Sequence, residues 1–104
     1  MAQRDSNGDL YAVNFVTTSD IAVKTNISMI ANPLDIICHL TGHQYRVKGT
    51  EQDSYGFLAQ EIERFLPNVV HTNDGFKSVN YTAIVGILVE AVKELSAKVV
   101  ALGG

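Results

Sequence analysis

The sequence is poor in several residue types, and each scarcity limits what the chain can be. It has no tryptophan, two prolines and one cysteine, Cys38, among 104 residues. A single cysteine cannot form a disulfide within the chain, so internal cross-links do not hold the fold together. Cys38 lies in the apolar run 34–40 with no activating base nearby. We therefore interpret it as a buried, inert thiol.

Charged residues are also scarce, and acidic ones dominate. They make up 18% of the chain, the formal net charge is −3, and the isoelectric point is about 5.4. The eight basic residues are scattered along the sequence. Nucleic-acid binding needs clustered Lys and Arg to contact phosphates. The sequence therefore predicts no nucleic-acid partner.

Long apolar runs are missing as well. The segment that follows Met1 has no apolar core, which argues against a signal peptide. The longest apolar stretch, at 83–92, is interrupted by Glu90 and followed by Lys93, so it does not predict a membrane span. We expect a soluble chain that is made in a cytoplasm and has no membrane partner.

The titratable residues show no metal or cofactor pattern. His39, His43 and His71 lack the spacing of metal ligands, because a predicted helix end separates the first two. Glu61 and Glu63 stand two residues apart on a predicted helix, so they face different ways and make a poor acid–base pair. No glycine-rich phosphate loop is present. We expect no metal and no cofactor.

Apolar residues, by contrast, are abundant for so short a chain. They make up 46% of the sequence, and the mean hydropathy is slightly positive at +0.09. A domain of this size buries only a modest fraction of its surface. The excess of apolar residues therefore suggests a partner subunit.

Periodicity and turn residues predict an α+β fold, a small mixed domain of short strands and helices followed by a long C-terminal helix. The predicted elements are a strand at 10–16, a helix from Pro33 with Asn32 as N-cap and Gly42 as its end, a strand at 43–48, a polar loop at 49–56, a helix at 57–66 stopped by Pro67, and a hairpin of 69–72 and 76–80 around Asn73-Asp74-Gly75.

The C-terminal helix, from about 81 to 102, carries an unbroken heptad pattern. Its members, named here the seam, are Tyr81, Val85, Leu88, Val92, Leu95, Val99 and Leu102. This pattern predicts a coiled coil, in which burial contributes on the order of 10 kcal/mol gross per chain. Ile84, Ile87 and Ala91 broaden the apolar face, so the first turns are expected to pack inward. Val and Leu at the two seam positions do not choose between two and three strands.

Ser19 and Lys24 are the residues most suited to chemistry. A serine becomes a nucleophile when a base takes its proton, and a lysine can be that base only in a desolvated site. Ile21, Val23 and Ile27 are expected to supply that site after assembly. Residues five apart point to opposite faces of a strand, so contact needs a turn or a neighbouring subunit. The spacing alone favours a simpler interpretation, a turn serine and a solvated lysine.

Four ordered motifs give this pair more weight. They are Ser-Asp followed by a lysine and Thr-Asn-Ile at 19–27, the segment from Leu34-Asp35 through Leu40-Thr41-Gly42 to Tyr45-Arg46, Gly-Phe-Leu-Ala-Gln-Glu-Ile-Glu at 56–63, and Gly-Phe-Lys-Ser-Val-Asn-Tyr at 75–81. Over about residues 10–102 the chain resembles the intramolecular chaperone of endosialidase tailspikes and phage tail fibres, classed as peptidase family S74.

The resemblance implies a homotrimer that guides a fibrous phage protein into register and then cuts itself off, as a single-turnover serine peptidase. It implies that Ser19 and Lys24 form the catalytic dyad and that the Ser19–Asp20 bond is cut. Residues 1–18 would then be the end of an upstream fibre or stalk, and 19–104 the chaperone domain. The implied location is the host cytoplasm during phage assembly, followed by release from the mature fibre. One departure is Ala22, where family members often carry arginine.

The route of cleavage and two alternative functions stay open at this stage. Attack by Ser19 on its upstream carbonyl would cut before Ser19, and attack on its own carbonyl would need a strained four-membered lactone. A cut after Ser19 therefore fits a water-mediated route or attack on a neighbouring chain. The alternatives are a non-cleaving trimerisation module with an idle dyad, and a domain whose C-terminal helix binds a different partner.

Overall fold

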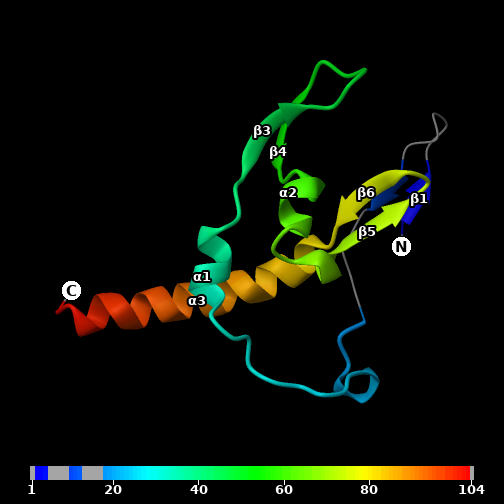
Figure 1. Cartoon of the computed structure of the whole chain (residues 1–104). Coiled ribbons are helices and arrows are strands. Elements are labelled where there is room, and N and C mark those ends of the chain that lie inside the picture. The colour runs from blue at the N-terminus through cyan, green and yellow to red at the C-terminus, as the bar shows by residue number, and fades with distance from the viewer. Residues whose placement is uncertain (1, 5–9, 13–17, 104) are drawn as a thin grey trace.

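The computed structural model describes residues 2–4, 10–12 and 18–103 and confirms the α+β class. A long helix, α3, runs along the molecule, and the elements between residues 33 and 79 pack on it or project from it (Figure 1). The elements are β1 (Ala2–Arg4), β2 (Leu10–Ala12), the 3-10 helix η1 (Ile21–Val23), α1 (Pro33–Cys38), β3 (His43–Arg46), β4 (Asp53–Gly56), α2 (Ala59–Glu63), the 3-10 helix η2 (Pro67–Val69), β5 (Val70–Asn73), β6 (Phe76–Val79) and α3 (Tyr81–Ala101).

The described strands form three separate two-stranded antiparallel sheets, β1–β2, β3–β4 and β5–β6. The strand predicted at 10–16 is present as β2 at Leu10–Ala12, and the rest of that prediction lies outside the described residues. Its partner β1 was not predicted, because three residues in a polar segment give no periodicity.

The β5–β6 hairpin confirms the prediction from Asn73-Asp74-Gly75. Asp74 and Gly75 both have positive φ, at 53° and 81°, as the central residues of a type I′ turn require. Asn73 and Phe76 pair across the turn. Local turn chemistry therefore sets the register of this hairpin.

The prediction of a polar loop at 49–56 is wrong in its second half. Asp53–Gly56 forms β4, which pairs with β3, and the Arg46 Nε–H donates to the Asp53 carboxylate at 3.0 Å. Most of β4 is exposed, so it lacks the apolar alternation by which a strand is recognised. The strand predicted at 43–48 ends two residues earlier, at Arg46.

Helix α1 begins at Pro33 as predicted, with Asn32 at the N-cap position. Asn32 has a left-handed backbone (φ 52°), and its side chain makes no capping hydrogen bond. The helix ends at Cys38, well before Gly42. The interpretation of Cys38 as buried is wrong for the single chain, because this six-residue helix packs on α3 by one face and leaves the thiol exposed.

Helix α2 spans Ala59–Glu63 and is shorter than the predicted 57–66. Its Ile62 is the most buried side chain of the described residues, at 1% exposure. Leu58 and Phe65, also on the predicted apolar face, stay largely exposed. Pro67 does not end α2 directly but begins η2, which leads into β5.

The core lies where α2, β5 and the start of α3 meet. It comprises Ile62, Val69, Val70 and Ile84, with Ile87 and Ala91 buried further along α3. The predicted inward packing of Ile84, Ile87 and Ala91 is therefore confirmed. The Asn80 side chain caps α3 by accepting a hydrogen bond from the Ala83 N–H at 3.2 Å.

This core is small for the length of the chain. The radius of gyration is 16.9 Å, whereas a compact domain of this length has about 13 Å. The chain exposes 8703 Å², against about 5,700 Å² for a compact monomer of the same mass. Much apolar surface is thus left without cover in a single chain.

We predict that Gly75→Ala lowers the free energy of unfolding by about 1–2 kcal/mol, because a Cβ disfavours the left-handed backbone. Gly42→Ala is the matched control. Neither position has an atom within 4 Å of an added Cβ, but only Gly75 has positive φ. Urea unfolding of both variants checks the prediction, and equal midpoints would contradict it.

Candidate functional site: an exposed arm and an unpartnered helix seam

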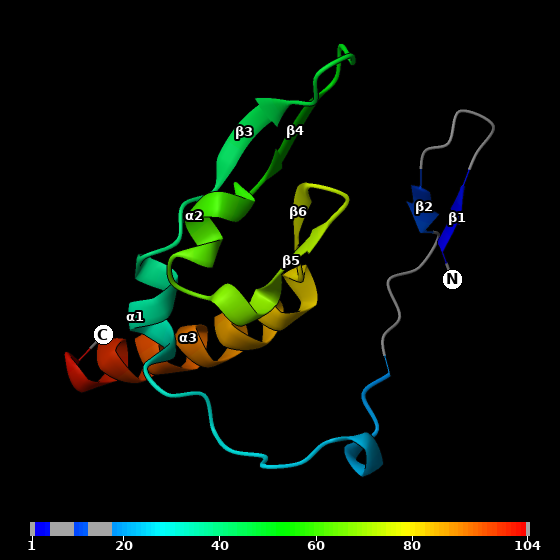
Figure 2. The same cartoon turned by 45° about the vertical axis from the view of Figure 1, so that its right-hand side comes forward.

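Residues 18–31, named here the arm, lead into α1 and lie away from the rest of the chain. The arm projects from α3 on the side opposite the β3–β4 hairpin (Figures 1 and 2). Every arm residue is exposed. Both members of the predicted dyad lie on this segment.

The 3-10 helix η1 supplies the turn that Ser19 and Lys24 need if they are to approach. The Asp20 carboxylate accepts a hydrogen bond from the Ala22 N–H at 2.8 Å, and the Lys24 N–H donates to the Ile21 carbonyl at 3.1 Å. Within the described residues no hydrogen bond joins Ser19 to Lys24, and both are exposed. The single chain thus has the turn but not the desolvated surroundings that a lysine base requires.

The arm also carries aliphatic side chains in water. Ile21, Val23, Ile27 and Met29 are between 65% and 87% exposed. Each would gain roughly 1.5–3 kcal/mol from full burial. The arm is therefore a segment that assembly or a partner would cover.

The seam of α3 is exposed along its whole length, from 40% at Leu88 to 88% at Leu102. It is a different face from the one that packs inward. At 100° per residue, the centre of the seam lies roughly a quarter turn from Ile84, Ile87 and Ala91. The helix therefore holds its own domain with one stripe and leaves a second apolar stripe unpartnered.

Charged side chains on α3 pair with one another and leave the seam uninterrupted. Lys93 contacts Glu90 at 3.4 Å, and Lys98 contacts Glu94 at 3.2 Å. None of the four stands at a seam position. Exposed pairs of this kind contribute little to stability, so they do not oppose burial of the seam.

Next to the start of the seam lies an apolar hollow, named here the tyrosine groove. It has a volume of about 760 Å³ and is lined by Tyr45, Tyr55, Val79, Asn80, Tyr81, Thr82 and Val85. Tyr81 and Val85 belong to both the groove and the seam. Sequence reasoning missed the groove, because Tyr45 and Tyr55 come from the hairpin whose second strand was not predicted.

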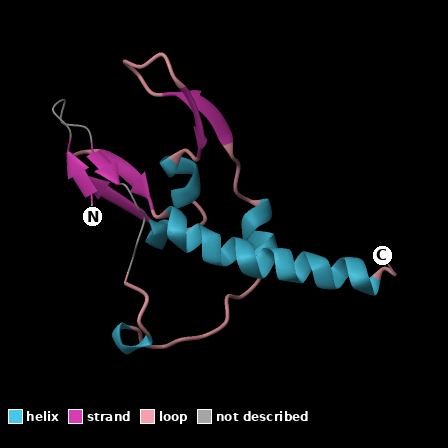
Figure 3. Ribbon diagram, turned by 180° about the vertical axis from the view of Figure 1, so that it is seen from behind, coloured by secondary structure: helices cyan, strands magenta, loops and turns pink. Residues whose placement is uncertain are grey.

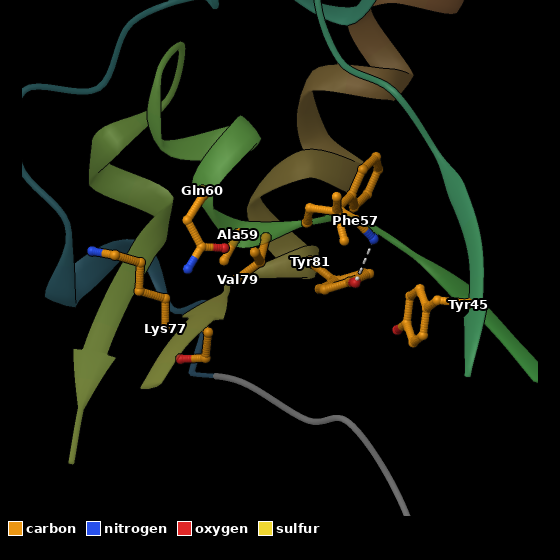
Figure 4. Close-up of a pocket in the computed structure, with 9 residues that line it drawn as sticks. Tyr45, Phe57, Ala59, Gln60, Lys77, Val79 and Tyr81 are labelled. Atoms are coloured by element: carbon orange, nitrogen blue, oxygen red, sulfur yellow. Dashed lines mark hydrogen bonds between the residues drawn. The ribbon is translucent and has the colours of Figure 1, made fainter. Parts of the chain in front are cut away.

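A second hollow of about 460 Å³ adjoins the groove and shares Tyr45, Val79 and Tyr81 with it (Figure 4). The Phe57 N–H donates to the Tyr81 hydroxyl at 3.1 Å, and the two rings lie 5.4 Å apart. The Lys77 ammonium at its other end is held by Glu63 at 3.1 Å. This hollow brings no pair of catalytic groups together.

Two pairs of titratable residues join elements of the fold. His43 Nε2 and Glu61 Oε1 are 2.7 Å apart and join β3 to α2, whereas Glu63 pairs with Lys77. Glu61 and Glu63 thus contact residues of different strands, which agrees with the prediction that they face different ways. No group of three or more His, Cys, Asp or Glu in the described ranges is placed to hold a metal ion. Among those residues no helix has the length and apolarity to span a bilayer.

The fold and the site together define a small α+β module built on a C-terminal helix with a free heptad face. Residues 19–71 match the chaperone of endosialidase family, peptidase S74, and the chain belongs to that family. It is 37% identical to the long tail fiber protein Gp37 of Enterobacteria phage K3 and of phage T2, over 92% of the chain, and 34% identical to Gp37 of Salmonella phage S16, over 82%.

The chain spans only 8% to 13% of the length of these relatives. The family and the tail fibre relatives support a chaperone role associated with a phage tail fibre and a location in phage assembly. They also make this a peptidase-related domain.

We predict that Gly56→Ala destabilises the fold by about 1–2 kcal/mol through overpacking. An added Cβ would lie 2.6 Å from the Tyr81 hydroxyl and 2.8 Å from that of Tyr45. In a Tyr81→Phe background the cost of Gly56→Ala should fall, because one of the two clashing oxygens is gone. Urea unfolding of the double-mutant cycle measures this coupling, and strictly additive effects would contradict it.

Proposed function

We propose that this domain assembles as a homotrimer through the seam, guides an upstream tail fibre segment of the same polypeptide into register, and then releases itself by one cut at Ser19–Asp20. In this proposal residues 1–18 end the fibre or its stalk, and 19–104 form the chaperone domain. Assembly takes place in the host cell, and the released domain is absent from the mature fibre.

The observation that carries the proposal is the division of α3 into two apolar stripes. Ile84, Ile87 and Ala91 already hold the domain together, so the exposed seam is not needed for the fold of one chain. The chain also exposes roughly 3,000 Å² more than a compact monomer would. Obligate interfaces bury 2,000–5,000 Å² in total, so association is the natural way to cover this excess.

The number of chains rests on the family. Valine at one seam position and leucine at the other permit two or three strands. The S74 resemblance implies three. The exposed seam of α3 therefore supports the proposed interface, and the family motifs support the proposed number of chains.

Assembly is proposed to switch on the chemistry. In the single chain Lys24 is exposed on the arm, outside the desolvated surroundings that a lysine base requires. Burial of the arm's aliphatic residues in the trimer would desolvate the amine and favour its neutral form. Cleavage then follows correct assembly and does not precede it.

The chemical step follows from the cut position. The neutral Lys24 amine takes a proton from the nucleophile, either a water positioned by Ser19 or the Ser19 hydroxyl of a neighbouring chain. The nucleophile adds to the Ser19 carbonyl carbon, the C–N bond to Asp20 breaks, and the lysine returns the proton to the leaving amine. Water supplies the oxygen of the new carboxylate directly or by hydrolysing the ester formed with the neighbouring chain.

A non-cleaving trimerisation module is the second candidate, and Ala22 is the observation that favours it. Family members often carry arginine at this position, and a methyl group cannot pair with a carboxylate across subunits. The Asp20 side chain caps η1 by accepting a hydrogen bond from the Ala22 N–H, so the local turn forms without that arginine. The two candidates share the trimer and differ in whether the chain is cut.

We predict that Leu95→Asp shifts the assembly from trimer to monomer, because three carboxylates at one layer of the seam would be buried without partners. Ala97→Asp is the matched control, since it adds the same charge to an exposed position outside the seam. Sedimentation equilibrium at several concentrations measures the mass. A parent protein that stays monomeric throughout would remove both trimer candidates and favour the partner-binding domain.

We predict that Ser19→Ala, Lys24→Ala and Lys24→Arg each abolish cleavage, since they remove either the base or the hydroxyl that attacks or positions the attacking water. Ser28→Ala, on the same exposed arm, should cut like the parent. Intact-mass spectrometry detects the loss of residues 1–19. Equal cleavage in all variants would rule out the dyad, and an uncut parent trimer would identify the non-cleaving module.

A further inference from the structure

We propose that the tyrosine groove of each chain holds the arm of a neighbouring copy, with Met29 and Ile27 inserted among its aromatic side chains. This inference rests on the proposed trimer and adds an arm exchange that the seam alone does not require. Two apolar surfaces without cover, the concave tyrosine groove and the extended arm, are present on the same chain. The arm and the β3–β4 hairpin, which contributes Tyr45 and Tyr55 to the groove, lie on opposite sides of α3 (Figure 3).

The groove suits short aliphatic side chains. Tyr45, Tyr55 and Tyr81 give it aromatic walls, and Val79 and Val85 complete its apolar lining. Thioethers make favourable contacts with aromatic rings, and an unbranched methionine adapts to irregular hollows. Met29 is 87% exposed in the single chain and so has much to gain from this site.

The groove also offers polar partners for an incoming backbone. Within the described residues the Tyr45 and Tyr55 hydroxyls form no hydrogen bond, whereas the Tyr81 hydroxyl is held by the Phe57 N–H. Ile27 and Met29 alternate with Ser28, so in an extended segment their side chains share one side. The free backbone groups of such a segment would meet the two tyrosine hydroxyls at the groove's edge.

The chain's own arm is badly placed for this groove. The Leu34 N–H donates to the Glu94 carboxylate, which anchors the end of the arm about 18 Å along α3 from Thr82 at the groove's edge. Met29 precedes Leu34 by five residues, which span at most about 18 Å. No length is left for passing around α3 to the side of the β3–β4 hairpin (Figures 1 and 2).

A second copy on the seam removes this difficulty. Tyr81 and Val85 belong to both surfaces, so a chain that packs on the seam lies directly beside the groove. Its arm, which leaves α3 on another side, would cross to the groove of its neighbour. The exchange would also bring the neighbouring chain's side chains close to Lys24, which needs desolvation.

The test uses two proteins that each carry one cysteine, in a Cys38→Ser background. One has Met29→Cys, and the other has Tyr55→Cys and a tag that changes its mass. They are refolded together and treated with a short bismaleimide. Because neither chain has two thiols, a covalent heterodimer arises only from contact between copies. We expect it to form at least about tenfold faster than with Val100→Cys in place of Tyr55→Cys, since docking raises the effective concentration.

Each other outcome has a distinct meaning. A trimer by sedimentation without preferential cross-linking overturns the arm exchange and leaves the proposed function standing. A monomer overturns both. Faster cross-linking of Tyr55→Cys to Tyr11→Cys than to Met29→Cys assigns the groove to the upstream segment and also overturns the exchange.

A second measurement does not depend on cross-linking geometry. Met29→Asp should raise the dissociation constant of the trimer by about tenfold or more, because a carboxylate in an apolar groove loses its hydration. Ser28→Asp places the same charge on the adjacent residue, which faces away from the groove, and should change it little. Equal effects of the two substitutions would contradict the inference.

Discussion

The structure depends on the way α3 divides its surface between two apolar stripes. Ile84 meets Ile62, Val69 and Val70, and this contact lies at the centre of the packing that joins α2, η2 and the β5–β6 hairpin to the helix. The seam, a quarter turn away, is left without a partner. A helix whose apolar residues all packed on its own domain would leave no apolar face exposed. Two stripes let one element hold the fold of a single chain and, in the proposed trimer, also form the interface.

That division explains why the hydrophobic core of the single chain is small. A domain of about a hundred residues balances burial against conformational entropy within a few kcal/mol. Many apolar residues of this chain lie on the seam, the arm and the groove, and few are buried. If these surfaces are covered only on assembly, the stability of the domain depends on chain concentration. The proposed trimeric chaperone would benefit from such a dependence, because its stability would then report that the chains have assembled.

The sequence predicted the features that depend on local chemistry. The Asn73-Asp74-Gly75 turn, the start of α1 at Pro33 and the extent of α3 follow from residues close together in the chain. Strand β4 and the exposure of Cys38 did not follow, because they depend on which faces find partners in space. The tyrosine groove was missed for the same reason, since it joins Tyr45 and Tyr55 to residues some thirty positions later. The motifs around Ser19 and Lys24 identified the family, but their spacing said nothing of the site.

The exposure of the arm bears directly on the proposed dependence of cleavage on assembly. A lysine base that was active in every folded monomer would cut chains before they had assembled. On the arm, Lys24 is exposed, and η1 forms the turn beside it with Asp20 as its cap. The Lys24 amine would have to be desolvated to act as a base. Among the described residues, the single chain brings no surface to the arm that could do this. In the proposed mechanism, the surface that covers the aliphatic residues of the arm therefore also determines when the Ser19–Asp20 bond is cut.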